Sequence, residues 1–368
     1  MSNESTIIAM ALQNERPKLL GWNLPQEDMS LLHSHWQAYE APPFYYHLLL
    51  AVIYFFLMIT STVGNGIVVW IFSTTKTLRS PSNMFIVNLA IFDLCMMLEM
   101  PMLLYNSGYQ RIIGGDLACT IYSVFGSFSG IGGSATNAAI AYDRYKAISS
   151  PLDGKMNKGQ AFAIIIITWL WTMPFTILPA LKIWGRYIPE GFLTTCSFDF
   201  LTDDEDTRVF VACIFVWAYC IPMILIMTFY SKLFSHVKAH EKMLRDQARR
   251  MNVQSLSANK DDAAQTVEIR IAKACFTIFF LFVCAWTPYA IVALIGAFGN
   301  RSLLTPLTTM IPAVAAKIVS CIDPWVYAIS HPRYRAALEK KCPWLGIKED
   351  FKDNVDTKSV TTNATTET

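Results

Sequence analysis

Charged residues are scarce in this chain, and their scarcity sets the first limits on its class. Asp, Glu, Lys and Arg make up 16% of the 368 residues, 53% are hydrophobic, and the mean hydropathy is +0.34. This composition excludes an ordinary soluble domain and indicates a polytopic membrane protein. The sequence also lacks a catalytic triad, a nucleotide-binding loop and a metal-binding cluster. We therefore predict no enzyme and no metal site, and we expect no nucleic-acid partner.

The apolar residues gather into long runs that suit transmembrane helices. A hydrocarbon layer about 30 Å thick needs roughly 20 apolar helical residues per crossing. Seven stretches qualify, at about 46–72, 83–107, 119–142, 161–181, 208–233, 270–298 and 303–329. We predict an all-α membrane protein, a seven-helix bundle followed by a short cytoplasmic amphipathic helix. The predicted divisions are an outer tail at 1–45, the bundle at 46–330, the amphipathic helix at 331–344 and a cytoplasmic tail at 345–368.

Basic residues are distributed unevenly between the two sides of this bundle. Most of them lie after the first, third, fifth and seventh stretches, among them Lys76, Arg79, Lys155, Lys158, Lys242, Arg250, Arg333 and Lys341. Loops rich in Lys and Arg stay in the cytoplasm, so we place the N-terminus outside and the C-terminus inside. The first 43 residues show no removable signal peptide. Asn3 begins a glycosylation sequon on the predicted outer face.

Nine cysteines are too few and too dispersed for a disulfide-rich fold. Six of them fall within predicted crossings, where they are most simply small core residues. Cys119 and Cys196 stand apart, because both lie on the predicted outer side, where disulfides persist. Cys342 follows the short basic amphipathic segment. That position is typical of reversible palmitoylation, and a free thiol is the alternative.

Lys317 is the costliest feature of the sequence, because it lies within the seventh apolar stretch. Placing an ammonium group in hydrocarbon has a large free-energy cost, so a lysine at this depth is by default a candidate functional residue. A desolvated lysine is driven toward its neutral amine, which can attack a carbonyl carbon and form a Schiff base. The lysine thus suggests a covalently held carbonyl ligand. Snorkelling to a helix end or pairing with a structural acid is the alternative explanation.

Short motifs recur along the seven stretches in a distinctive order. They are Gly64-Asn65, Asn88-Leu89-Ala90 with Asp93, Asp143-Arg144-Tyr145, Trp169, Pro222, Phe282 with Cys284-Ala285-Trp286-Thr287-Pro288-Tyr289, and Asp323-Pro324-Trp325-Val326-Tyr327. Each motif is weak alone, but their joint order is very specific. The chain resembles a rhodopsin-like G-protein-coupled receptor across all seven helices.

Within that family, Lys317 resembles the retinal-binding lysine of animal opsins, because it lies six residues before Asp323. The resemblance implies a covalent retinal, either 11-cis retinal or its 3-hydroxy form. Trp286 and Phe282 fall where the ring of that chromophore would press on the sixth helix, and Tyr289 belongs to the same predicted site. A protonated imine among apolar side chains needs a counterion, since otherwise it loses its proton.

Two acids are candidates for interaction with that imine. Where vertebrate visual opsins resemble one another in carrying a glutamate, this chain has the neutral Tyr122, which could add only a hydrogen bond. Glu190 lies six residues before Cys196 and matches the outer-loop counterion of invertebrate opsins. A Cys119–Cys196 disulfide would hold that loop over the bundle; a solvated loop acid is the alternative. Glu99 resembles the glutamate of blue-sensitive insect opsins, where ultraviolet opsins carry lysine, and we interpret it as a spectral tuning residue.

The resemblance also implies a switch at the cytoplasmic end. Arg144 can pair with Asp143, and Glu268 lies where opsins carry the acid that clamps this arginine. Breaking such a buried pair costs several kcal/mol unless new partners appear, so it suits a bistable lock. Asp323 replaces the commoner asparagine and adds a possible charge beside Asp93. The remaining predicted switch residues are Tyr145, Asn65, Pro324 and Tyr327.

We therefore predict a light-activated receptor that resembles insect blue-sensitive visual opsins, in the plasma membrane of the photoreceptor rhabdomere. The resemblance implies a Gq-type heterotrimer, arrestin and a receptor kinase acting on the Ser/Thr-rich tail as partners, besides membrane lipid. Arg333 replaces the lysine of the usual His-Pro-Lys triplet. A receptor for a diffusible amine or peptide, in which Lys317 is incidental, is disfavoured because the third helix has no carboxylate near Cys119 to meet an amine. A retinal photoisomerase or light-driven pump is the other alternative, and a pump should show acids between Cys119 and Tyr142, where none occurs.

Overall fold

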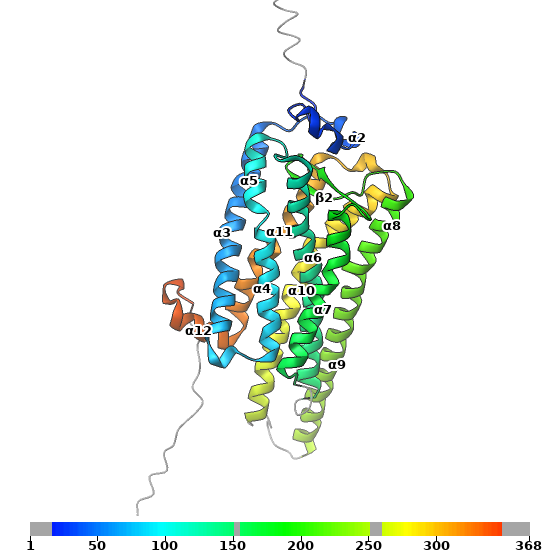
Figure 1. Ribbon diagram of the computed structural model, residues 1–368. Coiled ribbons are helices and arrows are strands. Elements are labelled where there is room, and N and C mark those ends of the chain that lie inside the picture. The colour runs from blue at the N-terminus through cyan, green and yellow to red at the C-terminus, as the bar shows by residue number, and fades with distance from the viewer. Residues whose placement is uncertain (1–16, 151–154, 251–259, 348–368) are drawn as a thin grey trace, which may run out of the picture.

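The protein is a bundle of long helices with a small β-hairpin at one end (Figure 1). The computed structural model describes residues 17–150, 155–250 and 260–347. Its long elements are α3 (Phe44–Thr74), α4 (Pro81–Met97) with α5 (Met100–Tyr109), α6 (Gly115–Ser149), α7 (Lys158–Ala180), α8 (Glu205–Ile214) with α9 (Ile221–Arg250), α10 (Lys260–Phe298) and α11 (Pro306–Ser330). The seven predicted crossings and the all-α class are confirmed.

Two of the crossings are interrupted where the sequence carries a proline or an extra residue per turn. Pro101 lies in the first turn of α5, and its missing N–H ends the regular bonding of α4 at Leu98 and Glu99. A π-helical segment, Phe215–Cys220, separates α8 from α9 just before Pro222. Such irregularities bend a helix and redirect its side chains. The first interruption carries Glu99.

Helix α6 differs from the other crossings because protein surrounds much of it. Judged by length and composition alone, six of the crossings among the described residues are long and apolar enough to span a membrane, and α6 is not among them. Its buried side includes small and polar residues such as Gly132, Ser134 and Asn137, and it packs against α4, α7, α9 and α10. A helix in contact mainly with other helices does not need a wholly apolar surface.

The outer end is closed by the hairpin and by the folded segment that precedes α3. Strands β1 (Tyr187–Glu190) and β2 (Thr195–Phe198) pair antiparallel, with Glu190 opposite Thr195. The preceding segment contains a 3₁₀ turn, Gln26–Leu31, and the short helix α2, Ser34–Gln37. Trp36 is fully buried there, in an apolar cluster that also includes Leu193 of the hairpin turn and Leu304 before α11. This part of the predicted outer tail therefore packs over the bundle.

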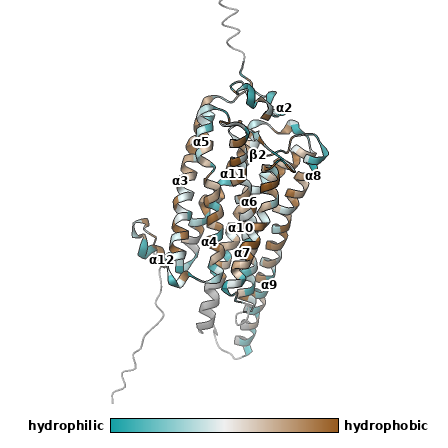
Figure 2. Ribbon diagram, viewed as in Figure 1, coloured by the Kyte–Doolittle hydropathy of each residue, from teal (hydrophilic) through white to brown (hydrophobic). Residues whose placement is uncertain are grey.

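The opposite end carries α12 (Pro332–Lys341), which confirms the predicted amphipathic helix after the seventh crossing. Its start is fixed by His331, whose Nδ1 accepts a hydrogen bond from the Tyr334 amide at 3.2 Å. Short 3₁₀ turns lie at Lys76–Leu78, Arg301–Leu303 and Pro343–Leu345. Figure 2 shows hydrophobic colour along the middle of the bundle and hydrophilic colour at the N-terminal segment and the far end of α9, as expected for a membrane protein.

Candidate functional site

Lys317 and Glu99 form a buried ion pair between two different crossings. The Lys317 Nζ atom on α11 lies 3.0 Å from Oε1 of Glu99, at the break between α4 and α5. The two side chains are 11% and 1% exposed, so water screens the pair very little. The same ammonium lies 5.7 Å from the centre of the Tyr122 ring, a distance that permits a cation–π contact. The structure therefore brings together three of the residues predicted from sequence.

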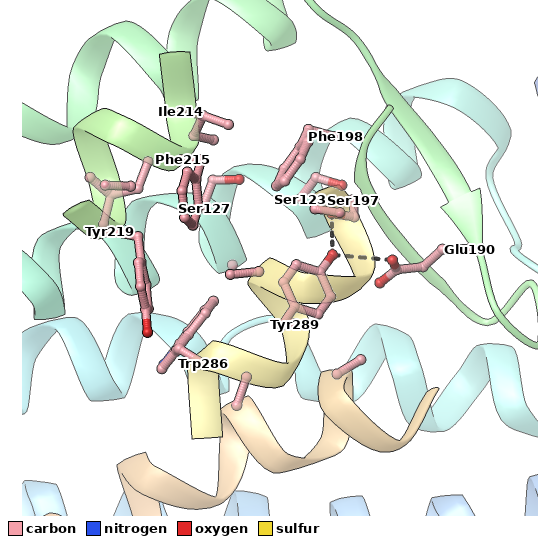
Figure 3. A pocket seen from close by; sticks show the side chains of 18 of the residues that line it. Ser123, Ser127, Glu190, Ser197, Phe198, Ile214, Phe215, Tyr219, Trp286 and Tyr289 are labelled. Atoms are coloured by element: carbon pink, nitrogen blue, oxygen red, sulfur yellow. Dashed lines mark hydrogen bonds between the residues drawn. The ribbon is translucent and has the colours of Figure 1, made fainter. Parts of the chain in front are cut away.

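Glu190 approaches the same region from the hairpin and is linked to α10 (Figure 3). The Tyr289 hydroxyl lies 3.1 Å from Glu190 Oε2 and is also hydrogen-bonded with the Ser197 hydroxyl. A phenol has one proton, so both bonds are satisfied when Ser197 donates to Tyr289 and Tyr289 donates to Glu190. Burial raises the pKa of Glu190 to about 7, against the opposing effects of the Lys317 charge and the Tyr289 hydrogen bond.

A disulfide fixes the strand pair that carries Glu190. Cys119, near the start of α6, is bonded to Cys196 on β2, with their Cα atoms 5.4 Å apart. Cys196 pairs with Pro189 across the hairpin, next to Glu190. Glu190 therefore lies in the residue pair next to Cys196, and the disulfide holds this part of the hairpin against the bundle. The predicted pairing of these two cysteines is confirmed.

The charged groups line a cavity whose walls are mostly apolar. Its lining includes Lys317, Glu99, Glu190 and Tyr122 together with all three predicted aromatic residues, Phe282, Trp286 and Tyr289. Phe282 stacks on Trp286, with ring centres 5.7 Å apart, and α10 thus presents an aromatic wall. Sequence reasoning missed Phe198, Phe215, Tyr219 and the three serines Ser123, Ser127 and Ser197, all drawn in Figure 3.

Two glycines of α6 allow this close packing, and they were a signal that the sequence offered. A Cβ atom added at Gly126 would lie 2.8 Å from Oε2 of Glu99. One added at Gly130 would lie 2.5 Å from Cη2 of Trp286. Such contacts are closer than carbon atoms tolerate, so any larger residue would displace the acid or the indole. These two glycines therefore mark the positions where the Glu99 and Trp286 side chains pack directly against the backbone of α6.

Several buried polar groups around Glu99 have unmet hydrogen-bonding capacity among the described residues. They include the hydroxyls of Tyr54 and Tyr122. Tyr54, on α3, is fully buried and interacts electrostatically with Glu99, but sequence reasoning missed it. Buried polar atoms are usually satisfied by water or by a ligand. An aldehyde ligand fits these residues: the cavity supplies one amine, two carboxylates and an apolar, aromatic-lined space.

A second buried cation lies at the opposite end of α6. Arg144 forms an ion pair with Asp143, its neighbour in sequence, and both side chains are buried. The Ser82 hydroxyl on α4 donates to Asp143 Oδ1 at 2.8 Å. Tyr145 stacks on Phe229 of α9, with ring centres 6.0 Å apart. Glu268 lies on α10, but its side chain is outside the described residues.

Polar residues in the middle of the bundle connect neighbouring crossings. Asp93 and Asp323 are both buried in this region and interact electrostatically with each other. Asn65 donates to the Ser320 carbonyl at 2.7 Å and so bonds α3 to α11. Pro324 packs against Gly64, where an added Cβ atom would lie 3.0 Å away.

The other predicted sites differ in how far the structure describes them. Cys342 is 4% exposed and packs in the apolar core beside α12. The side chain of Tyr327, the sequon at Asn3 and the Ser/Thr-rich tail lie outside the described residues.

Comparisons with known proteins agree on one family. Residues 64–327 match the family described as 7 transmembrane receptor (rhodopsin family). The chain is 64% identical to Opsin-3 of Manduca sexta, over 92% of this chain and 88% of that one. It is 61% identical to the blue-sensitive opsin of Apis mellifera, over 96% of this chain and 92% of that one. The crystal structure of squid rhodopsin superposes with a TM-score of 0.81 at 33% identity, covering 88% of this chain and 92% of the other.

These relatives and the seven-helix architecture confirm the resemblance drawn from the motifs, and a likeness of this extent carries the class of activity with it. The chain belongs to the insect opsins of the rhodopsin family, and it is therefore a multi-pass membrane receptor for light that carries retinal and couples to a G protein, not an enzyme.

Proposed function

We propose that the chain is a blue-sensitive visual pigment in which Lys317 carries retinal as a protonated Schiff base. The observation that supports this most is the buried Lys317 amine, 3.0 Å from a carboxylate and at the edge of an aromatic-lined cavity. The blue sensitivity rests on similarity to the Apis mellifera opsin and on Glu99. Both forms of the chromophore, 11-cis retinal and 3-hydroxyretinal, suit the apolar space between Trp286 and Phe215.

The counterion role is divided between two acids in this proposal. The sequence points to Glu190 as counterion and to Glu99 as tuning residue. The geometry favours Glu99 as the nearer partner, since two unit charges 3 Å apart attract by about 5 kcal/mol at an effective dielectric constant of 20. Glu190 acts as the second acid, oriented by Tyr289 and Ser197. A negative charge near one end of the chromophore also tunes its absorption, so Glu99 keeps the tuning role.

The protein around the cavity converts a change of ligand shape into a helix movement. Retinal, when bound, supplies light absorption and photoisomerisation. Trp286 and Phe282 form a rigid wall on α10, two residues or more before the internal Pro288. Proline leaves a carbonyl without its helical partner and allows the helix to bend there. Pressure on the wall therefore moves the part of α10 that leads to the cytoplasmic end.

At that end, the Asp143–Arg144 pair and Glu268 form the lock that we propose for the resting state. The chain is expected to activate a Gq-type heterotrimer through the cleft that opens between α9 and α10. The His331-Pro332-Arg333 triplet keeps the charge of the usual triplet at the start of α12. Arrestin and a receptor kinase acting on the tail would end the signal, in the rhabdomere membrane.

Reconstitution with 11-cis retinal tests the attachment directly. The full chain should give a band in the blue region of the visible spectrum, and Lys317→Ala should abolish it, because no other described lysine lines the cavity. Lys182→Ala is the matched control, since this exposed lysine lies outside the cavity and pairs with Asp116 at the surface. A band that survives in Lys317→Ala would overturn the proposal, and a band at ultraviolet wavelengths would overturn the blue assignment alone.

A further inference from the structure

A pair of hydroxyl groups lies at the end of the cavity that is remote from Glu190. Tyr219 belongs to the π-helical segment Phe215–Cys220 and lines the cavity, and its hydroxyl lies 2.5 Å from Oγ1 of Thr287 on α10. Figure 3 shows Tyr219 and Glu190 on opposite sides of Tyr289. Neither hydroxyl of the pair takes part in ligand attachment or in the helix movement.

A backbone carbonyl fixes the direction of the hydrogen bond within this pair. Thr287 Oγ1 donates its single proton to the Val283 carbonyl at 2.6 Å. The Tyr219 hydroxyl is therefore the donor in its bond to Thr287. The Tyr219 oxygen accepts no hydrogen bond from a described residue. Its lone pairs are thus available to a hydroxyl group on a ligand.

The surroundings of the Tyr219 hydroxyl are otherwise apolar. The other lining residues that α8 and the π-helical segment contribute are Val211, Ile214, Phe215 and Ala218. Phe215 stacks on the Tyr219 ring, with ring centres 5.5 Å apart, and holds the phenol in place. A ligand hydroxyl at this end of the cavity loses its hydrogen bonds to water, and the Tyr219 oxygen can replace one of them.

We propose that Tyr219, positioned by Thr287, binds the ring hydroxyl of 3-hydroxyretinal and makes this form the preferred chromophore. The inference rests on the proposed attachment at Lys317. That lysine lies within electrostatic reach of Glu190, at the other end of the cavity from Tyr219. The aldehyde carbon and the ring hydroxyl are likewise at opposite ends of the ligand. The ring hydroxyl donates to the Tyr219 oxygen, which donates in turn to Thr287.

A purely structural role for the pair predicts a different result. The bond between Tyr219 and Thr287 also links the π-helical segment to α10, and such a link needs no ligand. Its loss would then change the stability of the protein. It would not change the ratio in which the protein binds two ligands that differ only at the ring. The ratio of bound ligands therefore separates the two roles.

Competitive reconstitution of the full chain tests the assignment. The protein is incubated in darkness with equal amounts of 11-cis retinal and 11-cis 3-hydroxyretinal, and the bound forms are released as oximes and quantified by chromatography. We expect the wild type to retain the hydroxylated form in about 5-fold excess, which is the effect of one net hydrogen bond. The factor is modest because the Tyr219 proton already has a partner, so 11-cis retinal leaves no donor unpaired.

Tyr219→Phe should bring this ratio to unity or below, because the ring hydroxyl is then buried without its acceptor. Thr287→Val should lower the ratio by a smaller factor, and Thr287→Ser, which keeps the hydroxyl, should restore it. Tyr105→Phe and Thr277→Val are the matched controls, since they remove the same groups from exposed side chains outside the cavity and should leave the ratio unchanged. Circular dichroism checks the helical content of each variant.

Two results would overturn the proposal while leaving the attachment at Lys317 intact. They are a wild-type ratio at or below unity, and an undiminished ratio in Tyr219→Phe. If Tyr219→Phe does not fold, equal ratios in Thr287→Val and the wild type overturn the proposal by themselves. A wild type that retains neither form would contradict the attachment at Lys317, and this inference with it.

Discussion

The two ends of α6 each hold a buried cation beside a carboxylate, but they hold it in different ways. Near the hairpin, Lys317 on α11 pairs with Glu99 from the break between α4 and α5. Near the cytoplasmic side, Arg144 pairs with Asp143, the preceding residue of the same helix. The first pair connects two crossings, whereas the second can persist when helices separate. The outer end is therefore built to keep its geometry, and the inner end is built to exchange partners.

The surroundings of the two cations strengthen this contrast. The Lys317 end is closed by a disulfide, a strand pair and the folded segment around Trp36. The Arg144 pair lies within one helix, with no disulfide or strand pair beside it among the described residues, and Asp143 accepts a hydrogen bond from Ser82 of α4. Conformational switches are drawn from weakly constrained parts of a structure. The difference assigns ligand retention to one end of the molecule and movement to the other.

The strongest test of the contrast removes the acid that connects two crossings. Glu99→Gln leaves the Lys317 cation with Glu190 as its remaining acid, and loss of one partner of a buried pair costs about 3–5 kcal/mol. The reconstituted pigment should therefore lose its visible band at a pH about 2–4 units lower than the wild type. Alkaline titration of the absorption spectrum measures this midpoint.

Glu190→Gln is the matched variant for that titration, because it also neutralises one cavity acid. We expect a smaller change than in Glu99→Gln. If Glu190→Gln produces the larger change, Glu190 is the principal counterion, and the role of Glu99 is limited to spectral tuning.

Glu190 should also make the stability of the protein depend on pH. Its pKa is raised from 4.5 to about 7 by burial, so the folded protein holds a proton there that the unfolded chain has released. Stability from this group is fully present below about pH 4.5 and is lost progressively as the pH rises from 4.5 through 7, by at most about 3 kcal/mol. The thermal midpoint of the wild type should thus fall between pH 5 and pH 8.

Two variants sharpen this pH test. In Glu190→Gln the decline in thermal midpoint should become shallower, because the titrating group is gone. In Tyr289→Phe the carboxylate loses its hydrogen-bond donor, so the titration should move to higher pH. An identical decline in wild type and Glu190→Gln would show that other groups control it.

The sequence predicts the fold well because membrane helices follow from composition. Apolar runs located all seven crossings, and the basic segment around Lys340 indicated α12. Even α6, which is less apolar than the others, could be recognised from its place between Cys119 and the Asp143 motif. The folded segment around Trp36 was not predicted, since its burial depends on residues almost 160–270 positions later, such as Leu193 and Leu304.

Several residues of the site could be predicted from the sequence, but the contacts between them could not. Lys317, Trp286 and the cysteines follow from motif order. The contact between Lys317 and Glu99 depends on the interruption of the helix before Pro101, which sets the direction of the Glu99 side chain. A regular helical repeat does not predict that direction. In the sequence, nothing distinguishes Tyr54 from the other aromatic residues of the first apolar stretch. Only packing shows that it is buried near an acid.

The local pair at the inner end gives a test of intermediate size. Asp143→Asn keeps the shape of the side chain but removes the negative charge next to Arg144, so the resting state loses a lock. We expect nucleotide exchange on the G protein in darkness to rise several-fold, equivalent to about 1–2 kcal/mol. Ser82→Ala, which removes only the hydrogen bond to Asp143, should give a smaller rise. Unchanged dark activity in both variants would mean that the lock resides elsewhere.

The smallest expected effect concerns the serine behind Tyr289. Ser197→Ala removes the hydroxyl that is hydrogen-bonded with Tyr289, and a hydrogen bond of this kind contributes about 1 kcal/mol. Because Tyr289 then has one partner fewer, its bond to Glu190 becomes less well oriented, and the pH midpoint of the Glu190 titration should move up by less than about 1 unit. Ser127→Ala is the control, since this serine lines the same cavity without contacting Tyr289. A shift in Ser197→Ala as large as in Tyr289→Phe would show that the serine, and not the phenol, positions the acid. The outer end would then depend on the hairpin alone for its geometry, with α10 left freer to move than the comparison of the two ends implies.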